Sequence, residues 1–99
     1  EKLYLNSNEI NMQAADALYD FISKTNSLKD LRISNNVLED VAGMKIAEGL
    51  MKNDQIRVVH MASNKLSSET SELFADVIKK NQNLKDLDLS NNLFIMDEL

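Results

Sequence analysis

The sequence has no cysteine, no proline and no tryptophan, and it has two glycines in 99 residues. Without cysteine, the chain can form neither a disulfide framework nor a thiolate metal site, which suits a reducing compartment, so we expect a cytoplasmic, intracellular location. Without proline, and with both glycines inside one predicted helix, no segment resembles a flexible linker. We therefore expect a single structural unit over residues 1–99.

Charge and hydropathy argue against nucleic acids and membranes as partners. The chain has 16 acidic and 11 basic residues and a formal net charge of -5. Its average field therefore repels nucleic acids and anionic lipid surfaces. No apolar run approaches the roughly 18 residues that a bilayer-spanning helix requires. We expect neither nucleic acid nor membrane as a partner.

A fixed spacing of 28 residues organises the chain. Four short segments of alternating apolar and polar residues align without gaps, and each carries an asparagine at the same place: Asn8, Asn36, Asn64 and Asn92. In the last three copies the segment completes the pattern LxxLxLxxNxL, with other aliphatic residues allowed at the leucine positions. This pattern is the leucine-rich-repeat signature.

The alternation within each segment predicts a short, half-buried strand. In the second copy Leu31 and Ile33 should face inward, while Asp30, Arg32 and Ser34 face outward. The asparagine follows where the chain turns away, and its amide can satisfy backbone groups that a buried turn would leave unpaired. We therefore predict that the four asparagines stack as a structural ladder.

Between the strands the apolar spacing changes to i, i+3, i+4, i+7, which predicts one face of a helix. The inward positions are Ala15, Leu18, Tyr19 and Ile22, then Gly43, Ile46, Ala47 and Leu50, then Ser71, Phe74, Ala75 and Ile78. The first position is always small, which we attribute to a close approach of the helix to the strand layer. We predict that Asp40 caps the second helix and that Ser67 or Ser68 caps the third.

A 28-residue repeat with a full helix resembles the ribonuclease-inhibitor-like subfamily of leucine-rich repeats, and the GxxIAxxL of residues 43–50 resembles its helix signature. The resemblance covers nearly the whole chain, although Ala15 and Ser71 replace the glycine of the signature. It implies an α/β fold: a curved, right-handed βα solenoid with parallel strands on the concave face and helices on the convex face.

The same resemblance implies about three full repeats and a fourth strand, with a fourth helix beginning after Phe94. Neither end of the sequence has a recognisable capping unit. Solenoids need such units to cover their end repeats. We therefore expect the chain to be a fragment of a longer array.

The outward strand positions define a candidate surface for a protein partner. Their middle members should form one transverse row of Tyr4, Arg32, His60 and Asp88. Tyrosine and arginine are enriched at binding hot spots, because each offers a large contact area with a polar group. The candidate set is Tyr4, Asp30, Arg32, Val58, His60, Asp86 and Asp88. The alternative is that these are simply solvated strand residues.

Catalysis is not expected. His60 is the single histidine, and a carboxylate beside it would suggest acid–base chemistry. However, an open concave sheet offers no pocket that excludes water. The chain also lacks thiolates, calcium-loop spacing and a glycine-rich phosphate loop. We predict no catalytic residues, cofactor, metal or small-molecule substrate.

These observations favour a non-catalytic protein–protein interaction module, acting as a scaffold or regulatory segment of a larger intracellular protein. The fold alone does not give the function, so two further functions stay open. One is activation or other regulation of a small GTPase. The other is a structural segment of a cytoskeletal or ciliary assembly.

Overall fold

The computed structural model describes residues 1–93, and the predictions for Phe94 and for a fourth helix lie outside this range. Within it the strands are β1 (Lys2–Tyr4), β2 (Asp30–Arg32), β3 (Val58–His60) and β4 (Asp86–Asp88). The helices are η1 (Met12–Ala14), a short 3-10 turn, followed by α1 (Ala15–Lys24), α2 (Glu39–Met51) and α3 (Ser68–Lys80). Strand and helix alternate along the described chain, as the repeat predicts.

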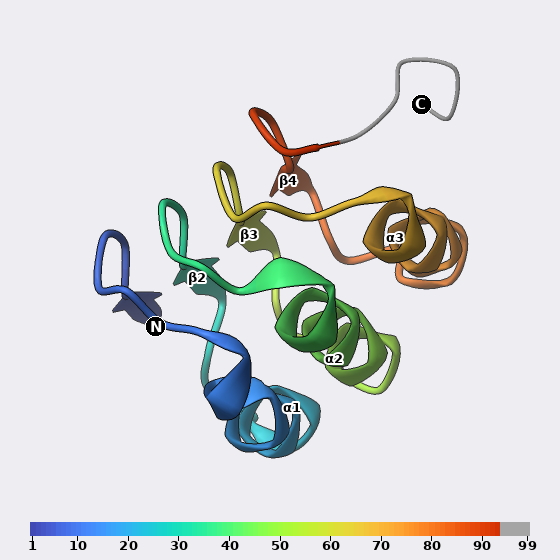
Figure 1. Cartoon of the computed structure of the whole chain (residues 1–99). Helices are drawn as coiled ribbons and strands as arrows, with labels where there is room; N and C mark the ends of the chain where they lie inside the picture. The colour runs from blue at the N-terminus through green and yellow to red at the C-terminus, as the bar shows by residue number, and fades with distance from the viewer. Residues whose placement is uncertain (94–99) are drawn as a thin grey trace.

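The strands form one parallel sheet in the order β1-β2-β3-β4. Residues 28 apart are paired, so Leu31 of β2 lies between Leu3 of β1 and Val59 of β3. Figure 1 shows the strands in one row and the helices in a second row beside it. Neighbouring strands are about 4.8 Å apart and packed helices about 8 to 10 Å apart, so the array bends with the strands inside. The predicted α/β solenoid is confirmed.

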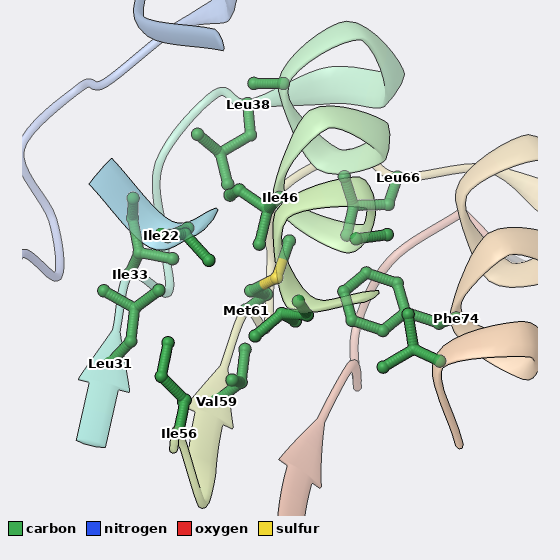
Figure 2. Packing of buried hydrophobic residues seen from close by; sticks show 14 of the residues in the cluster. Ile22, Leu31, Ile33, Leu38, Ile46, Ile56, Val59, Met61, Leu66 and Phe74 are labelled. Atoms are coloured by element: carbon green, nitrogen blue, oxygen red, sulfur yellow. The ribbon is translucent and has the colours of Figure 1, made fainter. Parts of the chain in front are cut away.

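The core lies between the two rows. Leu31 of β2, Val59 of β3 and Met61 directly after β3 pack toward Ile46 of α2 and Phe74 of α3 (Figure 2). The first four of these are fully buried, and Phe74 is 1% exposed. Because each layer of side chains comes from successive repeats, the core is continuous along the array.

The predicted asparagine ladder is confirmed in the three copies that have a preceding repeat. The Oδ1 of Asn36 accepts hydrogen bonds from the backbone of Asn8 and Ile10, both at 2.9 Å. Its Nδ2 donates to the carbonyls of Leu5 and Ile33, both at 3.0 Å. Asn64 and Asn92 make equivalent cross-repeat bonds. The first member, Asn8, is exposed, and its Nδ2 donates within its own turn.

A second ladder, which we did not predict, holds the opposite ends of the repeats. The Nδ2 of Asn53 donates to the carbonyls of Ile22 and Thr25, at 2.8 and 2.9 Å. The Nδ2 of Asn81 donates to the carbonyls of Leu50 and Asn53, at 3.1 and 2.9 Å. Both asparagines are buried. They satisfy carbonyls at the helix C-termini that would otherwise lack partners.

Position 43 needs a small residue for a different reason from the one we predicted. A Cβ at this position would lie 2.6 Å from Cδ2 of Leu66 and 3.0 Å from Oγ1 of Thr70, both in the next repeat. The close approach is therefore between α2 and the following repeat, not between α2 and the strands. On the other flank of α2, a Cβ at Gly49 would lie 3.0 Å from Cγ2 of Ile22 on α1.

The predicted inward face is correct for α2 and partly wrong for α3. The four predicted positions of α2 are all buried, whereas Ala75 and Ile78 of α3 are exposed. Thr70 and Val77 are buried instead. Ala75 and Ile78 occupy the positions that face a following repeat, and no helix follows α3 within residues 1–93. Periodicity identified the helix but not which neighbour covers each flank.

The predicted cap of the second helix is also wrong. α2 begins at Glu39, so Asp40 lies inside its first turn. The carboxylate reaches across to the start of α3, where Oδ1 accepts from the backbone N–H of Ser67 at 2.9 Å and from Oγ1 of Thr70 at 2.6 Å. The Ser67 hydroxyl donates to the other carboxylate oxygen. Ser67 is the N-cap position of α3, as predicted, but Asp40 supplies the hydrogen bonds.

Candidate functional site

The strands bring the predicted concave residues into two transverse rows. The upper row is in register as predicted, with Tyr4 beside Arg32, Arg32 beside His60 and His60 beside Asp88. The lower row pairs Lys2, Asp30, Val58 and Asp86 in the same way. All seven predicted site residues therefore lie on one face of the sheet, spread over its four described strands.

Tyr4, Asp30 and Arg32 form a compact cluster on the first two strands. Nε and Nη2 of Arg32 donate to the two oxygens of Asp30 at 3.0 and 3.1 Å, which is a bidentate pair. The Tyr4 hydroxyl donates weakly to Asp30 at 3.4 Å. The Arg32 guanidinium also lies over the Tyr4 ring, 5.1 Å from its centroid, in a cation–π contact.

The cluster is ordered by a carboxylate that is itself covered. Asp30 is 7% exposed, whereas the prediction placed it facing solvent. The Arg32 hydrogen bonds lower the pKa of Asp30 below its ordinary value and outweigh the upward effect of desolvation. Asp30 therefore stays ionised and orients Arg32. Tyr4, with 52% of its surface exposed, is the accessible apolar group of this cluster.

The last two strands present an acidic region with the single histidine. Nε2 of His60 lies 3.1 Å from Oδ2 of Asp86, the diagonal neighbour of the lower row, and not against Asp88 in its own row. Oδ1 of Asp88 accepts from the backbone N–H of Ser90 at 3.0 Å. Hydrogen bonds from Ser90 lower the pKa of Asp88, and the proximity of His60 adds to this. Val58 lies half-buried between Asp30 and Asp86.

The seven concave residues do not line the hollow on the loops that follow the strands. A hollow of about 450 Å³ lies on the loops after the strands and is lined by residues such as Ser7, Asn35, Ser63 and Lys65. None of these belongs to the concave set. Within residues 1–93, no three histidine, aspartate or glutamate side chains gather closely enough to hold a metal ion. In the same range, no helix has both the length and the apolar character to cross a bilayer.

Comparison with known proteins identifies the repeat. The sequence model of a family described as Leucine Rich repeat matches residues 25–47 and 80–98. The first stretch contains β2 and Asn36, and the second contains β4 and Asn92 of the ladder. The chain is a leucine-rich-repeat solenoid. Repeats of this kind are typical of non-enzymatic interaction modules.

A solved structure of the same fold supports this architecture. The chain is similar to a protein described as "Leiomodin-1 Actin-Binding Site 2 (ABS2)", with 19% sequence identity and a TM-score of 0.79. The similarity covers 92% of this chain and 53% of that chain. At this identity the likeness concerns the fold alone. The finer assignment to the ribonuclease-inhibitor-like subfamily stays a prediction.

Proposed function

We propose that this chain is a non-catalytic protein-interaction module whose concave face contacts a protein partner. The contact set is the predicted one: Tyr4, Asp30, Arg32, Val58, His60, Asp86 and Asp88. The observation that supports the proposal is the Tyr4–Arg32–Asp30 cluster, in which an exposed aromatic ring and a guanidinium are held by a buried carboxylate. A preformed arrangement of this kind loses little conformational entropy when a partner docks.

The two ends of the concave face favour different groups of that partner. Lys2, Tyr4 and Arg32 provide an exposed ring and two cations, of which Arg32 is paired with Asp30. Asp86 and Asp88 provide two carboxylates, with His60 beside them. Asp30 contributes by positioning Arg32, because its own surface is covered. A partner with matched charges would therefore dock in one orientation.

Affinity capture with the 99-residue chain as bait tests this proposal. Partners identified by mass spectrometry are compared between the wild type and a Tyr4→Ala/His60→Ala variant. We expect the variant to lose the partner and to keep its thermal unfolding midpoint, since neither side chain is in the buried core. Glu72→Ala on the exposed face of α3 is the matched control. Equal capture by all three proteins would contradict the concave-face assignment.

A second candidate function is binding within an actin assembly. The likeness to a structure named for an actin-binding site favours this candidate over regulation of a small GTPase. Co-sedimentation of the chain with actin filaments tests it directly. We expect the chain to pellet with filaments and the Tyr4→Ala/His60→Ala variant to pellet less. If the wild type stays in the supernatant while affinity capture yields another partner, actin is excluded and the interaction-module proposal stands.

We also propose that this protein acts in the cytoplasm, because a chain without cysteine suits a reducing compartment. Fractionation of cells that express the protein, followed by immunoblotting, tests this location. Recovery in the secreted or organelle-lumen fraction would contradict it. Regulation of a small GTPase stays a prediction. The pairing of Arg32, one of the two arginines, with Asp30 gives it no support.

A further inference from the structure

A basic strip runs along the edge of the array where the helices end and the strands begin. Three segments 28 residues apart, 24–29, 52–57 and 80–85, each begin and end with a cation. The six cations, which we call the basic edge, are Lys24, Lys29, Lys52, Arg57, Lys80 and Lys85. With Asp54 as their one acid, these segments carry +5, so the other residues carry -10 in a chain of -5.

The fold arranges the basic edge in two rows. Lys24 and Lys80 end α1 and α3, and Lys52 directly follows α2, so one row lies at the helix ends. The other row directly precedes the strands. There the backbone N–H of Arg57 donates to the carbonyl of Lys29, and that of Lys85 donates to the carbonyl of Arg57, both at 2.8 Å. The second row therefore has the close spacing of the sheet, about 4.8 Å per strand.

The backbone between the two rows is fixed by the second asparagine ladder. Asn53 donates across to the preceding repeat, and its Oδ1 accepts from the backbone N–H of Gln55 at 2.6 Å and Ile56 at 3.3 Å. Asn81 repeats this pattern with Asn83 and Leu84, at 3.0 and 3.2 Å. The backbone from which these cations project is thus held by buried and partly buried hydrogen bonds.

Several of these charges have no acidic partner in direct contact within residues 1–93. Nζ of Lys29 donates to Oε1 of Gln55 at 2.7 Å, and Nζ of Lys85 donates to the carbonyl of Gln82 at 3.0 Å; both acceptors are neutral. Lys52 lies over the Tyr19 ring, 5.5 Å from its centroid. Lys24 differs, because it pairs with Asp20 at 2.6 Å. The edge therefore keeps a net positive field at its centre and C-terminal end.

A hollow lies at the centre of the basic edge. Its volume is about 270 Å³, and it lies between Lys52 and Lys80, with Met51, Asn53 and Asn81 among its lining residues. Asp54 also lines it and accepts from Nε2 of Gln55 at 3.0 Å. Two lysines and one aspartate line this hollow, so its net positive charge favours a carboxylate over a cation.

We propose that the basic edge binds an extended acidic segment of a protein, with carboxylates paired to the two rows and one acidic side chain in the hollow. Polyanions of larger footprint fit less well. A duplex or an anionic lipid surface covers a larger area than the three segments, and the rest of the chain, which carries -10, repels it. The three segments also contain no aromatic residue of their own on which bases could stack.

This inference concerns a different surface from the concave face and is tested separately. The probe is a fluorescein-labelled oligoglutamate of about ten residues, which when extended spans roughly 33 Å, similar to the 34 Å longest dimension of the array. Binding is measured by fluorescence anisotropy at about 0.15 M salt, where long-range charge effects are screened. We expect Arg57→Glu/Lys80→Glu to weaken binding at least about tenfold.

The matched control is Lys2→Glu/Lys65→Glu, which changes net charge equally at two exposed lysines off the edge. We expect its affinity to stay within about twofold of the wild type, as for Tyr4→Ala/His60→Ala. Thermal unfolding checks that each variant is folded. If Arg57→Glu/Lys80→Glu does not fold, Arg57→Gln/Lys80→Gln takes its place, and we expect this variant also to bind more weakly than the wild type. An equal loss in the control would overturn the proposal. So would no binding by the wild type, or tighter binding of oligothymidylate or phosphatidylserine vesicles.

Discussion

Within residues 1–93, α2 is covered on both flanks, whereas α1 and α3 are each covered on one. Ile22 of α1 and Leu50 of α2 face the following repeat and are fully buried, but Ile78 at the same position of α3 is 62% exposed. On the other flank Val77 of α3 is fully buried, but Phe21 of α1 is 44% exposed. The same repeat position is core in one copy and surface in another, so burial here depends on the neighbouring repeat.

Replacing Leu50 or Ile78, which share one repeat position, by alanine gives the largest expected difference in the free energy of unfolding. Leu50→Ala should destabilise the chain by about 2 to 5 kcal/mol, because it leaves a cavity between two packed helices. Ile78→Ala should change the free energy of unfolding by no more than about 0.5 kcal/mol, because the side chain is mostly exposed. Urea unfolding followed by circular dichroism measures both. Similar losses for the two variants would remove the distinction between the middle and end repeats.

The asparagine ladder gives a second comparison between a middle repeat and an end repeat, this time for polar groups. Asn64 is fully buried, and its Nδ2 donates to the carbonyls of Ile33 and Ala62, at 2.9 and 3.1 Å. Asn64→Ala should cost about 1 to 3 kcal/mol, because these carbonyls lose their side-chain donor. Asn8→Ala should cost less than about 0.5 kcal/mol, since the exposed amide bonds within its own turn. Urea unfolding measures both free energies. A larger loss of stability for Asn8→Ala than for Asn64→Ala would be incompatible with the ladder.

A methyl group at Gly43 tests how tightly α2 meets the following repeat. Gly43→Ala gains about 1 kcal/mol of helix propensity. However, the new Cβ would lie 2.6 Å from Leu66, a fully buried side chain, and overpacking costs about 1 to 3 kcal/mol. We expect a net loss of about 1 kcal/mol in the free energy of unfolding. A stabilised variant in thermal unfolding would show that the interface relaxes more readily than its geometry implies.

The smallest effect is the pH dependence of the link between α2 and α3. Desolvation raises the pKa of Asp40, but hydrogen bonds from Ser67 and Thr70 outweigh it and leave the pKa below its ordinary value. A lowered folded-state pKa stabilises the chain above the unfolded-state pKa, and this stability is lost as the pH falls through the folded value. Asp40→Asn should therefore cost about 1 kcal/mol at neutral pH.

The gap between wild type and Asp40→Asn should then narrow below about pH 4. Asp30 and Asp88 also have lowered pKa values, so both proteins lose stability in acid. The diagnostic quantity is the difference between the two, measured by urea unfolding at neutral and acidic pH. A difference that stays constant would mean that Asp40 contributes no ionised hydrogen bonds to α3.

The sequence predicted those features that the repeat period determines. The register of Tyr4, Arg32, His60 and Asp88 follows from the 28-residue spacing and the alternation along each strand. The asparagine ladder follows from the same spacing. The second ladder could have been found in this way, because Thr25, Asn53 and Asn81 are also 28 apart. Its residues lie outside the signature pattern, so they read as a polar loop.

The features that the sequence did not predict depend on contacts between side chains of different repeats. Asp40 is a residue type that often caps helices, but the helix whose start it stabilises is α3 and not its own helix α2. Asp30 has an outward strand position, but Arg32 and Tyr4 cover it. His60 contacts the diagonal Asp86 because a long side chain can reach past its direct neighbour. Local periodicity gives the direction of a side chain and not its partner.

Hydrogen exchange of the backbone amides measures most directly whether neighbouring repeats stabilise one another. Slow exchange reports the free energy of opening at each amide. We expect the slowest exchange in α2 and in β2 and β3, which have repeats on both sides, and faster exchange in α1 and α3. Equal protection of the three helices, or the greatest protection in α3, would contradict the account.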